Sequence, residues 1–225
     1  MIDDPDLNDN RKYDYSNSEF QYRDEYPIII EIIPKNSTVI DFGCGSGSLL
    51  ELLISEKSVD GIGYEISESG INACSKKGIK AVCKSIDQYH EEIHAKQFDY
   101  AICNVTLQMV MFPEVLLREM IRVSKYQIIS FPNFAFYKNR LDMIIHGRMP
   151  RPMLFGYRWN STGHIHQFSS ADFYEIIREI GNVRIINSYH VNSQNPLKKM
   201  LRKTFPNLFE FTPIYLLESI NYEQI

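Results

Sequence analysis

A turn of alternating glycines, set between an apolar run and a leucine-rich run, constrains the fold of this chain more than any other stretch. Thr38 to Phe42 is short, apolar and β-branched, which is typical of a strand buried on both faces. Gly43, Gly45 and Gly47 follow, and the leucines within residues 49–53 have helical spacing. Glycine permits positive φ and lets a ligand approach bare backbone. The order strand, glycine turn, helix predicts a site for a nucleotide-type ligand.

The residues around this turn favour S-adenosylmethionine over a dinucleotide. The glycines run G-x-G-x-G, and Ser48 stands where the third glycine of a dinucleotide fingerprint would be. Asp41 precedes the turn, where a carboxylate repels a pyrophosphate but attracts the ammonium and sulfonium groups of S-adenosylmethionine. Residues 59–65 predict the next strand, and Glu65 at its end is expected to accept both ribose hydroxyls. The alternative is a tight strand-to-helix connection that binds no ligand.

The succession of apolar runs predicts an α/β fold of the Rossmann-like, doubly wound type with a seven-stranded sheet. The expected strands are residues 38–42, 59–65, 79–83, 98–103, 126–131, 183–191 and 211–218. Helices are expected at residues 27–33, from residue 49, and at 67–77, 113–123 and 169–181. This alternation specifies a mostly parallel sheet with helices on both faces. The last two strands are expected to form a C-terminal antiparallel hairpin.

A segment at about residues 132–168 interrupts the alternation and predicts a lid insertion within a single domain spanning residues 22–225. It holds several prolines and aromatic residues and one expected helix at residues 138–146. Basic residues exceed acidic ones there, so the lid could receive an anionic small molecule, a partner protein or an RNA segment. A solvated surface loop is the alternative. Residues 195–203 are expected to be a linker or a short helix.

Charge and composition disfavour several classes of protein. Residues 1–21 are acidic and are predicted to form a disordered tail. The net charge of −4 gives no global basic surface, so a dedicated nucleic-acid binder is disfavoured. The four cysteines form no C-x-x-C pair, which is typical of reduced thiols. With no signal peptide, and no apolar run of the roughly 18 residues that a membrane span needs, we expect a cytoplasmic protein.

Polar residues near the expected strand ends are further candidates for the cofactor site. Asp87 follows the third strand and is expected either to accept the exocyclic amine of adenine or to cap a helix. Asn104 follows the fourth strand, at the rim where open α/β sheets bind ligands. Arg23 and Tyr26, ahead of the first strand, are expected near the mouth of the ligand site.

Candidates for the acceptor side come from the strand ends and the lid. The expected substrate-binding residues are Gln108, Asn133, Tyr157 and Trp159. Methyl transfer from a sulfonium needs alignment and, where the acceptor is protonated, a base. His164 and His166 are the candidate bases, and the alternative is that both only form hydrogen bonds within the lid. Because no third ligand accompanies them, no metal site is expected.

These motifs resemble the class I S-adenosylmethionine-dependent methyltransferases and, within them, the MetW family associated with methionine biosynthesis. The resemblance runs from about residue 22 to 186, through V-I-D-F-G-C-G-S-G-S-L-L at 39–50, Y-E-I at 64–66, T-L-Q at 106–108, S-F-P-N-F at 130–134 and G-R-M-P at 147–150. It implies that the glycine turn and the second strand hold the cofactor, through Asp41, Gly43, Cys44, Gly45, Glu65 and Ile66. It also implies homoserine O-acetyltransferase as a partner.

Two hypotheses about function follow. The first is a MetW-type methyltransferase that uses S-adenosylmethionine and acts on a small-molecule acceptor. The second is a non-catalytic protein that binds S-adenosylmethionine or S-adenosylhomocysteine and regulates homoserine O-acetyltransferase. The lack of an unambiguous catalytic base favours this second hypothesis. A third, an RNA methyltransferase that uses the basic lid, has less support because the chain carries no net positive charge.

Overall fold

The structure is a computed structural model that describes residues 14–15, 22–151, 159, 162–191, 200–202 and 204–220. Its helices include α1 Tyr26–Ile32, α2 Ser48–Lys57, α3 Glu68–Lys76, α4 Pro113–Val123, α5 Tyr137–His146, α6 Ser170–Ile180 and α8 Pro206–Phe209, with the 3₁₀ helix η2 at Leu107–Met109. Its strands are β1 Thr38–Phe42, β2 Asp60–Glu65, β3 Lys80–Cys83, β4 Phe98–Asn104, β5 Ser124–Ser130, β6 Val183–His190 and β7 Pro213–Ser219.

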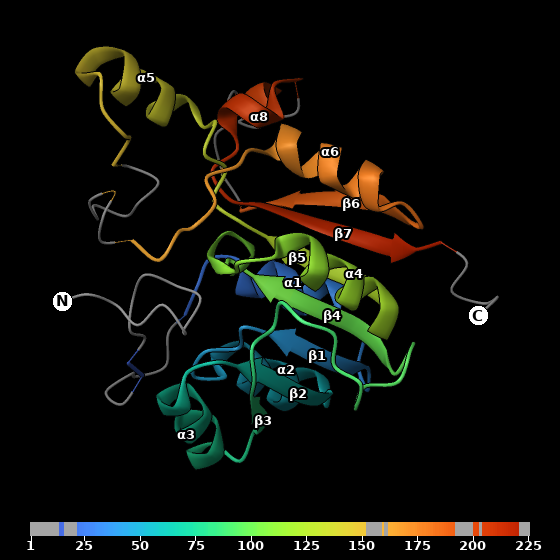
Figure 1. Cartoon of the computed structure of the whole chain (residues 1–225). Coiled ribbons are helices and arrows are strands. Elements are labelled where there is room, and N and C mark those ends of the chain that lie inside the picture. Colours follow the sequence, from blue (N-terminus) through green and yellow to red (C-terminus); the bar gives the residue numbers. More distant parts are fainter. Residues whose placement is uncertain are drawn as a thin grey trace.

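The strands form one seven-stranded sheet in the order β3-β2-β1-β4-β5-β7-β6. The pairs β1–β2, β1–β4, β2–β3 and β4–β5 are parallel. β7 lies between β5 and β6 and runs antiparallel to both (Figure 1). The expected Rossmann-like sheet, mostly parallel with a C-terminal antiparallel hairpin, is confirmed. Expected and observed strand bounds differ by only a residue or two, as is usual at element ends.

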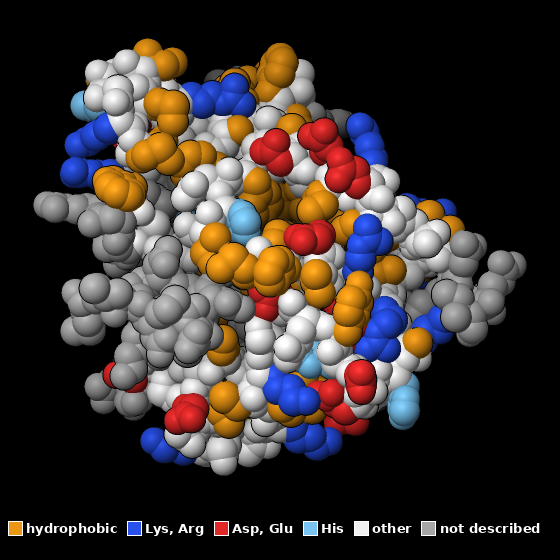
Figure 2. Space-filling view, viewed as in Figure 1, with side chains coloured by type: hydrophobic (Ala, Val, Ile, Leu, Met, Phe, Trp, Pro, Cys, Tyr) orange, Lys and Arg blue, Asp and Glu red, His pale blue; other side chains and the backbone are white. Residues whose placement is uncertain are grey.

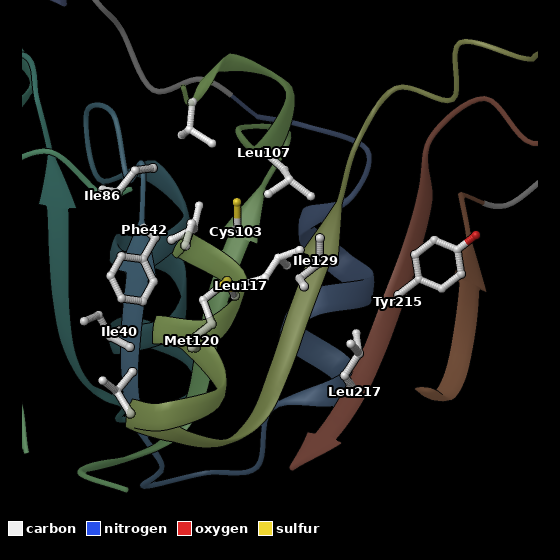
Figure 3. Packing of buried hydrophobic residues seen from close by; sticks show 14 of the residues in the cluster. Ile40, Phe42, Ile86, Cys103, Leu107, Leu117, Met120, Ile129, Tyr215 and Leu217 are labelled. Carbon is white, nitrogen blue, oxygen red and sulfur yellow. The ribbon is translucent and has the colours of Figure 1, made fainter. Parts of the chain in front are cut away.

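Hydrophobic side chains pack against both faces of the sheet. On one face, Leu117 and Met120 of α4 lie over Ile40 of β1 and Ile129 of β5 (Figure 3). On the other face a second cluster joins α1 and α2 to the strands. Burying a side chain of this size contributes roughly 1.5–3 kcal/mol relative to leaving it exposed. The two clusters therefore hold the strands, and the edge at which the strands end, in a fixed arrangement.

The register of the central strands brings several candidate residues to one edge of the sheet. Asp41 of β1 pairs with Gly63 of β2 on one side and with Ile102 of β4 on the other. The glycine turn, Glu65 and Asn104 follow directly at the carboxyl ends of these three strands. Open α/β sheets bind their ligands at this edge.

Part of the expected lid stands away from the sheet. Helix α5 projects from the body of the molecule (Figure 1). Its residues Ile144 and Ile145 are 79% and 70% exposed, and Figure 2 shows hydrophobic side chains at the surface in this region. Tyr157 and Arg158 lie outside the described residues. In the described part, the lid thus presents apolar as well as basic side chains to its surroundings.

Two other expectations fall mostly outside the described residues. Of the acidic tail at residues 1–21, the structure describes only Asp14 and Tyr15, and of residues 195–203 only 200–202. The short helix α8 at residues 206–209 was not expected from the sequence. Among the described helices, none combines the length and the apolar character required to cross a bilayer.

Candidate functional site

The glycine turn after β1 has a backbone conformation that L side chains rarely adopt. Gly43 and Gly45 have φ values of 82° and 56°, in the left-handed region. A Cβ on Gly43 would lie 2.5 Å from the Thr106 side chain, so this part of the turn packs closely against the segment after β4. Replacing either glycine would therefore strain the turn, and replacing Gly43 would also displace its neighbour.

Glu65 is joined to the turn by backbone hydrogen bonds. The Gly45 N–H donates to Oε2 at 2.8 Å, and the Ser67 N–H donates to Oε1 at 2.9 Å. Burial raises the pKa of the Glu65 carboxyl, whereas the backbone hydrogen bonds oppose this rise. A carboxylate has about four lone-pair sites. Glu65 therefore retains capacity to accept hydrogen bonds from the hydroxyl groups of a ligand.

Asp41 is a buried carboxyl at the end of β1, only 3% exposed. Within the described part of the chain, no hydrogen bond to its carboxyl group is observed. Burial, and next the charge of Glu65, raise the pKa of Asp41 to about 7. The two carboxyls thus interact electrostatically, as expected if both border one site. A buried carboxyl without a hydrogen-bond partner is costly unless a cation accompanies it.

Tyr15 lies over the same turn, although nothing in the sequence pointed to it. Its backbone N–H donates to Ser69 Oγ at 2.9 Å. Its ring lies about 3.3 Å from the positions that a Cβ on Gly45 or on Gly70 would occupy. A single tyrosine in an acidic segment has no periodicity that would mark it, so only the structure brings it to the glycine turn.

Other candidates for the cofactor site lie close by, with partners of their own. The Asp87 carboxylate accepts from the Met111 and Phe112 N–H groups at 2.9 and 3.1 Å, just before α4 begins. Asp87 thus holds the segment before α4, a helix without a side-chain cap hydrogen bond, and its contact with adenine stays a prediction. Asn104 Oδ1 accepts from Ser130 Oγ.

Cys44 and Ile66 flank the two acids in the sequence. A hydrogen bond with the Cys74 thiol and, second, burial raise the pKa of the Cys44 thiol. Ile66 follows Glu65 directly, and its carbonyl oxygen lies 3.5 Å from Cys83 Sγ, which donates to it. Both residues thus lie within the same group of loops, and their contact with a cofactor stays a prediction.

Gln108 and Asn133, expected to bind the acceptor, are almost fully buried. Gln108 Nε2 donates to the Val105 carbonyl oxygen at 2.9 Å. Asn133 Nδ2 donates to the carbonyl oxygens of Asn207 and Glu210 at 3.0 and 2.9 Å, and its Oδ1 accepts from the Ala135 N–H at 3.1 Å. Both side chains thus support the backbone of other segments, and their direct contact with an acceptor stays a prediction.

The two candidate bases lie on a segment that packs against η2. The backbone N–H groups of Ile165 and His166 donate to the Gln108 carbonyl oxygen at 2.9 and 3.0 Å. His164 is buried, and His166 Nε2 lies 3.3 Å from the Met111 carbonyl oxygen. Trp159 is 73% exposed, and Tyr157 lies outside the described residues. Among the described residues no cluster of three or more His, Cys, Asp or Glu has metal-binding geometry.

A cavity of about 430 Å³ lies beyond the carboxyl end of β4, at Val105. Its walls come from the segment before α1, the residue after β4, and the region around β6 and α8. The lining residues are Tyr22, Arg23, Asp24, Glu25, Val105, Val191, Arg202, Glu210, Phe211 and Thr212. Arg23 was expected near the ligand mouth from the sequence, as was Tyr26. Burial and then the charge of Asp41 raise the pKa of Tyr26 to about 12, which links α1 to the glycine turn.

The residues at the glycine turn fit S-adenosylmethionine. The buried Asp41 carboxyl suits an ammonium or sulfonium group. Glu65 has acceptor capacity for ribose hydroxyls. Gly45 has no side chain, so a ligand could approach its backbone at the place where the Tyr15 ring lies in this structure. A diphosphate at this point would face two carboxyl groups and no basic side chain of the turn.

Similar solved structures define the class of protein to which this fold belongs. One similar chain comes from the complex between the Haloferax volcanii Trm112 methyltransferase activator and a putative methyltransferase, with a TM-score of 0.63, 13% identity, and coverage of 88% of this chain and 90% of that one. Another is an S-adenosylmethionine-dependent methyltransferase from Mesorhizobium loti, with a TM-score of 0.61, 13% identity, and coverage of 89% and 100%. The fold is that of the class I S-adenosylmethionine-dependent methyltransferases.

Sequence comparison identifies the family within this class. The family described as "Methionine biosynthesis protein MetW" matches residues 23–217. The chain belongs to the MetW family. It is also 34% identical over 164 residues to a bifunctional methionine biosynthesis protein MetXA/MetW from Rhodopirellula baltica. The match covers 69% of this chain but only 26% of that relative, so the chain spans about a quarter of the relative's length.

Proposed function

We propose that this chain is a methyltransferase that uses S-adenosylmethionine and acts on a small-molecule acceptor. One observation carries the proposal: a buried carboxyl, Asp41, borders the glycine turn with no hydrogen bond from the described residues, next to the hydrogen-bonded carboxyl of Glu65. A cationic amino-acid group would pair with the first carboxyl, and a ribose would bind to the second. When bound, S-adenosylmethionine supplies a methyl group activated by its positively charged sulfur.

The residues of this chain would contribute mainly binding and alignment. Asp41 ionises when an ammonium group lies beside it, because the cation offsets the burial that raises its pKa. Glu65, already oriented by the N–H groups of Gly45 and Ser67, needs no reorganisation to accept from the ribose. His164 and His166 remain the proposed bases for an acceptor that carries a proton.

Calorimetry with S-adenosylhomocysteine, the demethylated product, tests the binding part of this proposal. We expect binding by the wild-type chain, and loss of affinity in Glu65→Ala and Asp41→Ala. Glu68→Ala is the matched control, because Glu68 is exposed at the first turn of α3. No binding by the folded wild-type chain would refute the proposal. Transfer of labelled methyl groups from S-adenosylmethionine into a cell extract, absent in Glu65→Ala, tests catalysis itself.

We propose as a second candidate function that the chain regulates homoserine O-acetyltransferase in methionine biosynthesis. The observation in its favour is the apolar surface of α5, where Leu141, Met143, Ile144 and Ile145 are 45–79% exposed (Figure 2). Exposed apolar side chains that adjoin one another often mark a protein contact. The relative from Rhodopirellula baltica, which carries MetXA and MetW in one name, supports a link between the two activities.

Mixing experiments with homoserine O-acetyltransferase separate this candidate from the first. We expect the two proteins to co-elute in gel filtration, and acetyltransferase activity to change when this chain is added. Ile144→Glu should abolish co-elution without changing the melting temperature, because Ile144 is 79% exposed. Ile186→Glu, at an exposed position of β6, is the control, because Ile186 is 43% exposed and lies outside α5. An inert mixture would refute the regulatory role and leave the methyltransferase proposal standing.

A further inference from the structure

The cavity beside α1 is formed by segments that lie far apart in the sequence. Residues 22–25 form one wall, Val105 another, and residues 202 and 210–212 a third. Its volume of about 430 Å³ lies within the range of roughly 300–1,000 Å³ that is usual for small-molecule sites. The family resemblance and the glycine turn assign no ligand to this space.

Both signs of charge line the cavity, and two of its acidic residues, Glu25 and Glu210, are buried, whereas Asp24 is exposed. Glu210 is 3% exposed and its carboxylate contacts His190 Nδ1. The Glu25 side chain is 10% exposed and lies 3.5 Å from Arg23 Nε. Among the basic residues, Arg202 is held in position by a hydrogen bond, in which its Nη1 donates to the Val191 carbonyl oxygen at 2.8 Å. A guanidinium carries five N–H donors, so Arg202 has further donors for a ligand.

Val105 adds a sign of strain at the same cavity. It is a β-branched residue with φ of 53°, a conformation that such residues rarely adopt. Its N–H donates to the carbonyl oxygen and the Oγ of Ser130, each at 3.0 Å, and its carbonyl oxygen accepts from Gln108 Nε2 at 2.9 Å. Backbone strain that surrounding contacts maintain is found preferentially at ligand sites. The strain at Val105 is therefore an indication, independent of charge, that the cavity binds a ligand.

The cavity adjoins the end of the cofactor site where Asp41 lies. Val105 follows the last residue of β4, and β4 pairs with β1 at Asp41. Tyr26 follows Glu25 in the sequence and interacts electrostatically with Asp41. A molecule in the cavity would thus lie beside the amino-acid end of a cofactor bound at the glycine turn, on the side from which an acceptor would approach.

We propose that this cavity binds a small zwitterion as the methyl acceptor, with its ammonium group between Glu25 and Glu210 and its carboxylate at Arg202. A zwitterion offers one group to each sign of charge that lines the cavity, whereas a ligand with a single charge would interact favourably with only one of them. The role as acceptor rests on the proposed function, whereas the binding does not. In the transfer, a lone pair on a side-chain heteroatom of the zwitterion, and not on its ammonium nitrogen, forms the bond to the methyl carbon. The carbon–sulfur bond breaks with its electrons staying on sulfur, and the proton that the heteroatom carried passes to the proposed base, His164 or His166.

Calorimetry with matched probes tests the binding. The probes are 2-aminobutyrate, norvaline and norleucine, each compared with the carboxylic acid that lacks the ammonium group and with the amine that lacks the carboxylate. We expect at least one amino acid to bind ten times more tightly than both of its analogues. Glu210→Gln and Arg202→Gln should each weaken that binding at least tenfold. Glu175→Gln and Arg178→Gln, at exposed positions of α6, should leave it unchanged.

The outcomes separate this inference from the proposed function. If no amino acid binds more tightly than its analogues, or if the α6 controls weaken binding as much as the cavity variants, the inference is wrong. Binding of S-adenosylhomocysteine by the same variants reports that they are folded, since none of the four residues lies at the glycine turn. Failure of S-adenosylhomocysteine to bind, with zwitterion binding intact, would instead refute the cofactor site and leave the cavity assignment standing.

Discussion

The glycine turn and the acceptor cavity meet at one edge of the sheet, yet they are assembled in opposite ways. The turn, Asp41, Glu65 and Ser67 belong to one strand-helix-strand unit, and the hydrogen bonds of the Glu65 carboxylate join residues at most 20 positions apart. The cavity draws on residues 22–25, 105, 191, 202 and 210–212, which lie far apart in the sequence and come together in a sheet where β7 lies between β5 and β6. One site is therefore specified locally, and the other depends on the closing of the whole sheet.

This difference predicts that the two sites can be damaged separately. A change within the local unit should reduce cofactor binding and leave the cavity intact. A change in the residues that join distant segments should do the reverse. Each of the following variants is expected to affect one site and is measured at both, with S-adenosylhomocysteine at the turn and the best-bound amino acid at the cavity.

The largest effect is expected for Glu65→Ala. The change removes the acceptor for the ribose hydroxyls and leaves the N–H groups of Gly45 and Ser67 without their partner. Losing two charge-assisted hydrogen bonds, each worth about 1.5–3 kcal/mol, should weaken S-adenosylhomocysteine binding at least about 100-fold. Calorimetry gives the affinity, and Glu68→Ala is the control. Affinity within threefold of wild type would show that Glu65 does not bind the ligand.

Asn133→Ala should have the opposite selectivity. Its amide joins the start of the lid to the carbonyl oxygens of residues 207 and 210, and so positions Glu210 in the cavity wall. Removing a fully buried amide leaves these carbonyls without donors and should lower the free energy of unfolding by about 2–3 kcal/mol. Urea unfolding measures this loss. Amino-acid binding should fall at least fivefold while S-adenosylhomocysteine binding stays, and an equal loss at both sites would contradict the separation.

The sequence allowed the fold to be predicted, and with it the position of Asp41, Glu65 and the glycines at one edge of the sheet, whereas the cavity was largely missed. Asp41, Glu65 and the glycines fall in one short pattern whose geometry follows from strand and helix periodicity. Arg23 was expected near a ligand, but Arg202 and Glu210 were not, because their position depends on which strands become neighbours. Trp159 was expected to bind the substrate only because the lid segment is rich in aromatic residues. Composition does not predict how exposed a side chain is, and Trp159 is 73% exposed.

A change of pH should affect ligand binding at the turn. Burial, and next Glu65, raise the Asp41 pKa to about 7, and only the ionised form pairs with an ammonium group. Affinity for S-adenosylhomocysteine should therefore rise roughly fivefold between pH 6 and pH 7, and level off above pH 8. Calorimetry between pH 6 and 8.5 checks this slope. In Asp41→Asn the affinity should be lower and flat over this range, and a wild-type profile without slope would contradict the assignment.

The same carboxyl links pH to stability in the ligand-free protein. The folded pKa of Asp41, about 7, lies above its usual value of 3.8, so folding favours the protonated form. Its stabilising effect is complete below the unfolded pKa and is lost as the pH rises from about 4 to 7. At pH 8 the Asp41→Asn variant should be more stable than wild type, by up to about 4 kcal/mol, in urea unfolding. Equal stability at pH 8 would mean that Asp41 ionises there without cost.

The smallest effect is expected at Tyr15, which covers the turn from the N-terminal side. Its ring lies against Gly45 and Gly70, and its N–H donates to Ser69 Oγ, so it limits the access of water to the turn. Tyr15→Ala should weaken S-adenosylhomocysteine binding about threefold to tenfold, the effect of losing one partly buried aromatic contact. Tyr15→Phe should stay close to wild type. Tyr22→Ala is the matched control, since Tyr22 lines the cavity and not the turn. Tighter binding by Tyr15→Ala would mean that the ring occupies the ligand's place instead of covering it, and the N-terminal segment would then compete with the cofactor for the glycine turn.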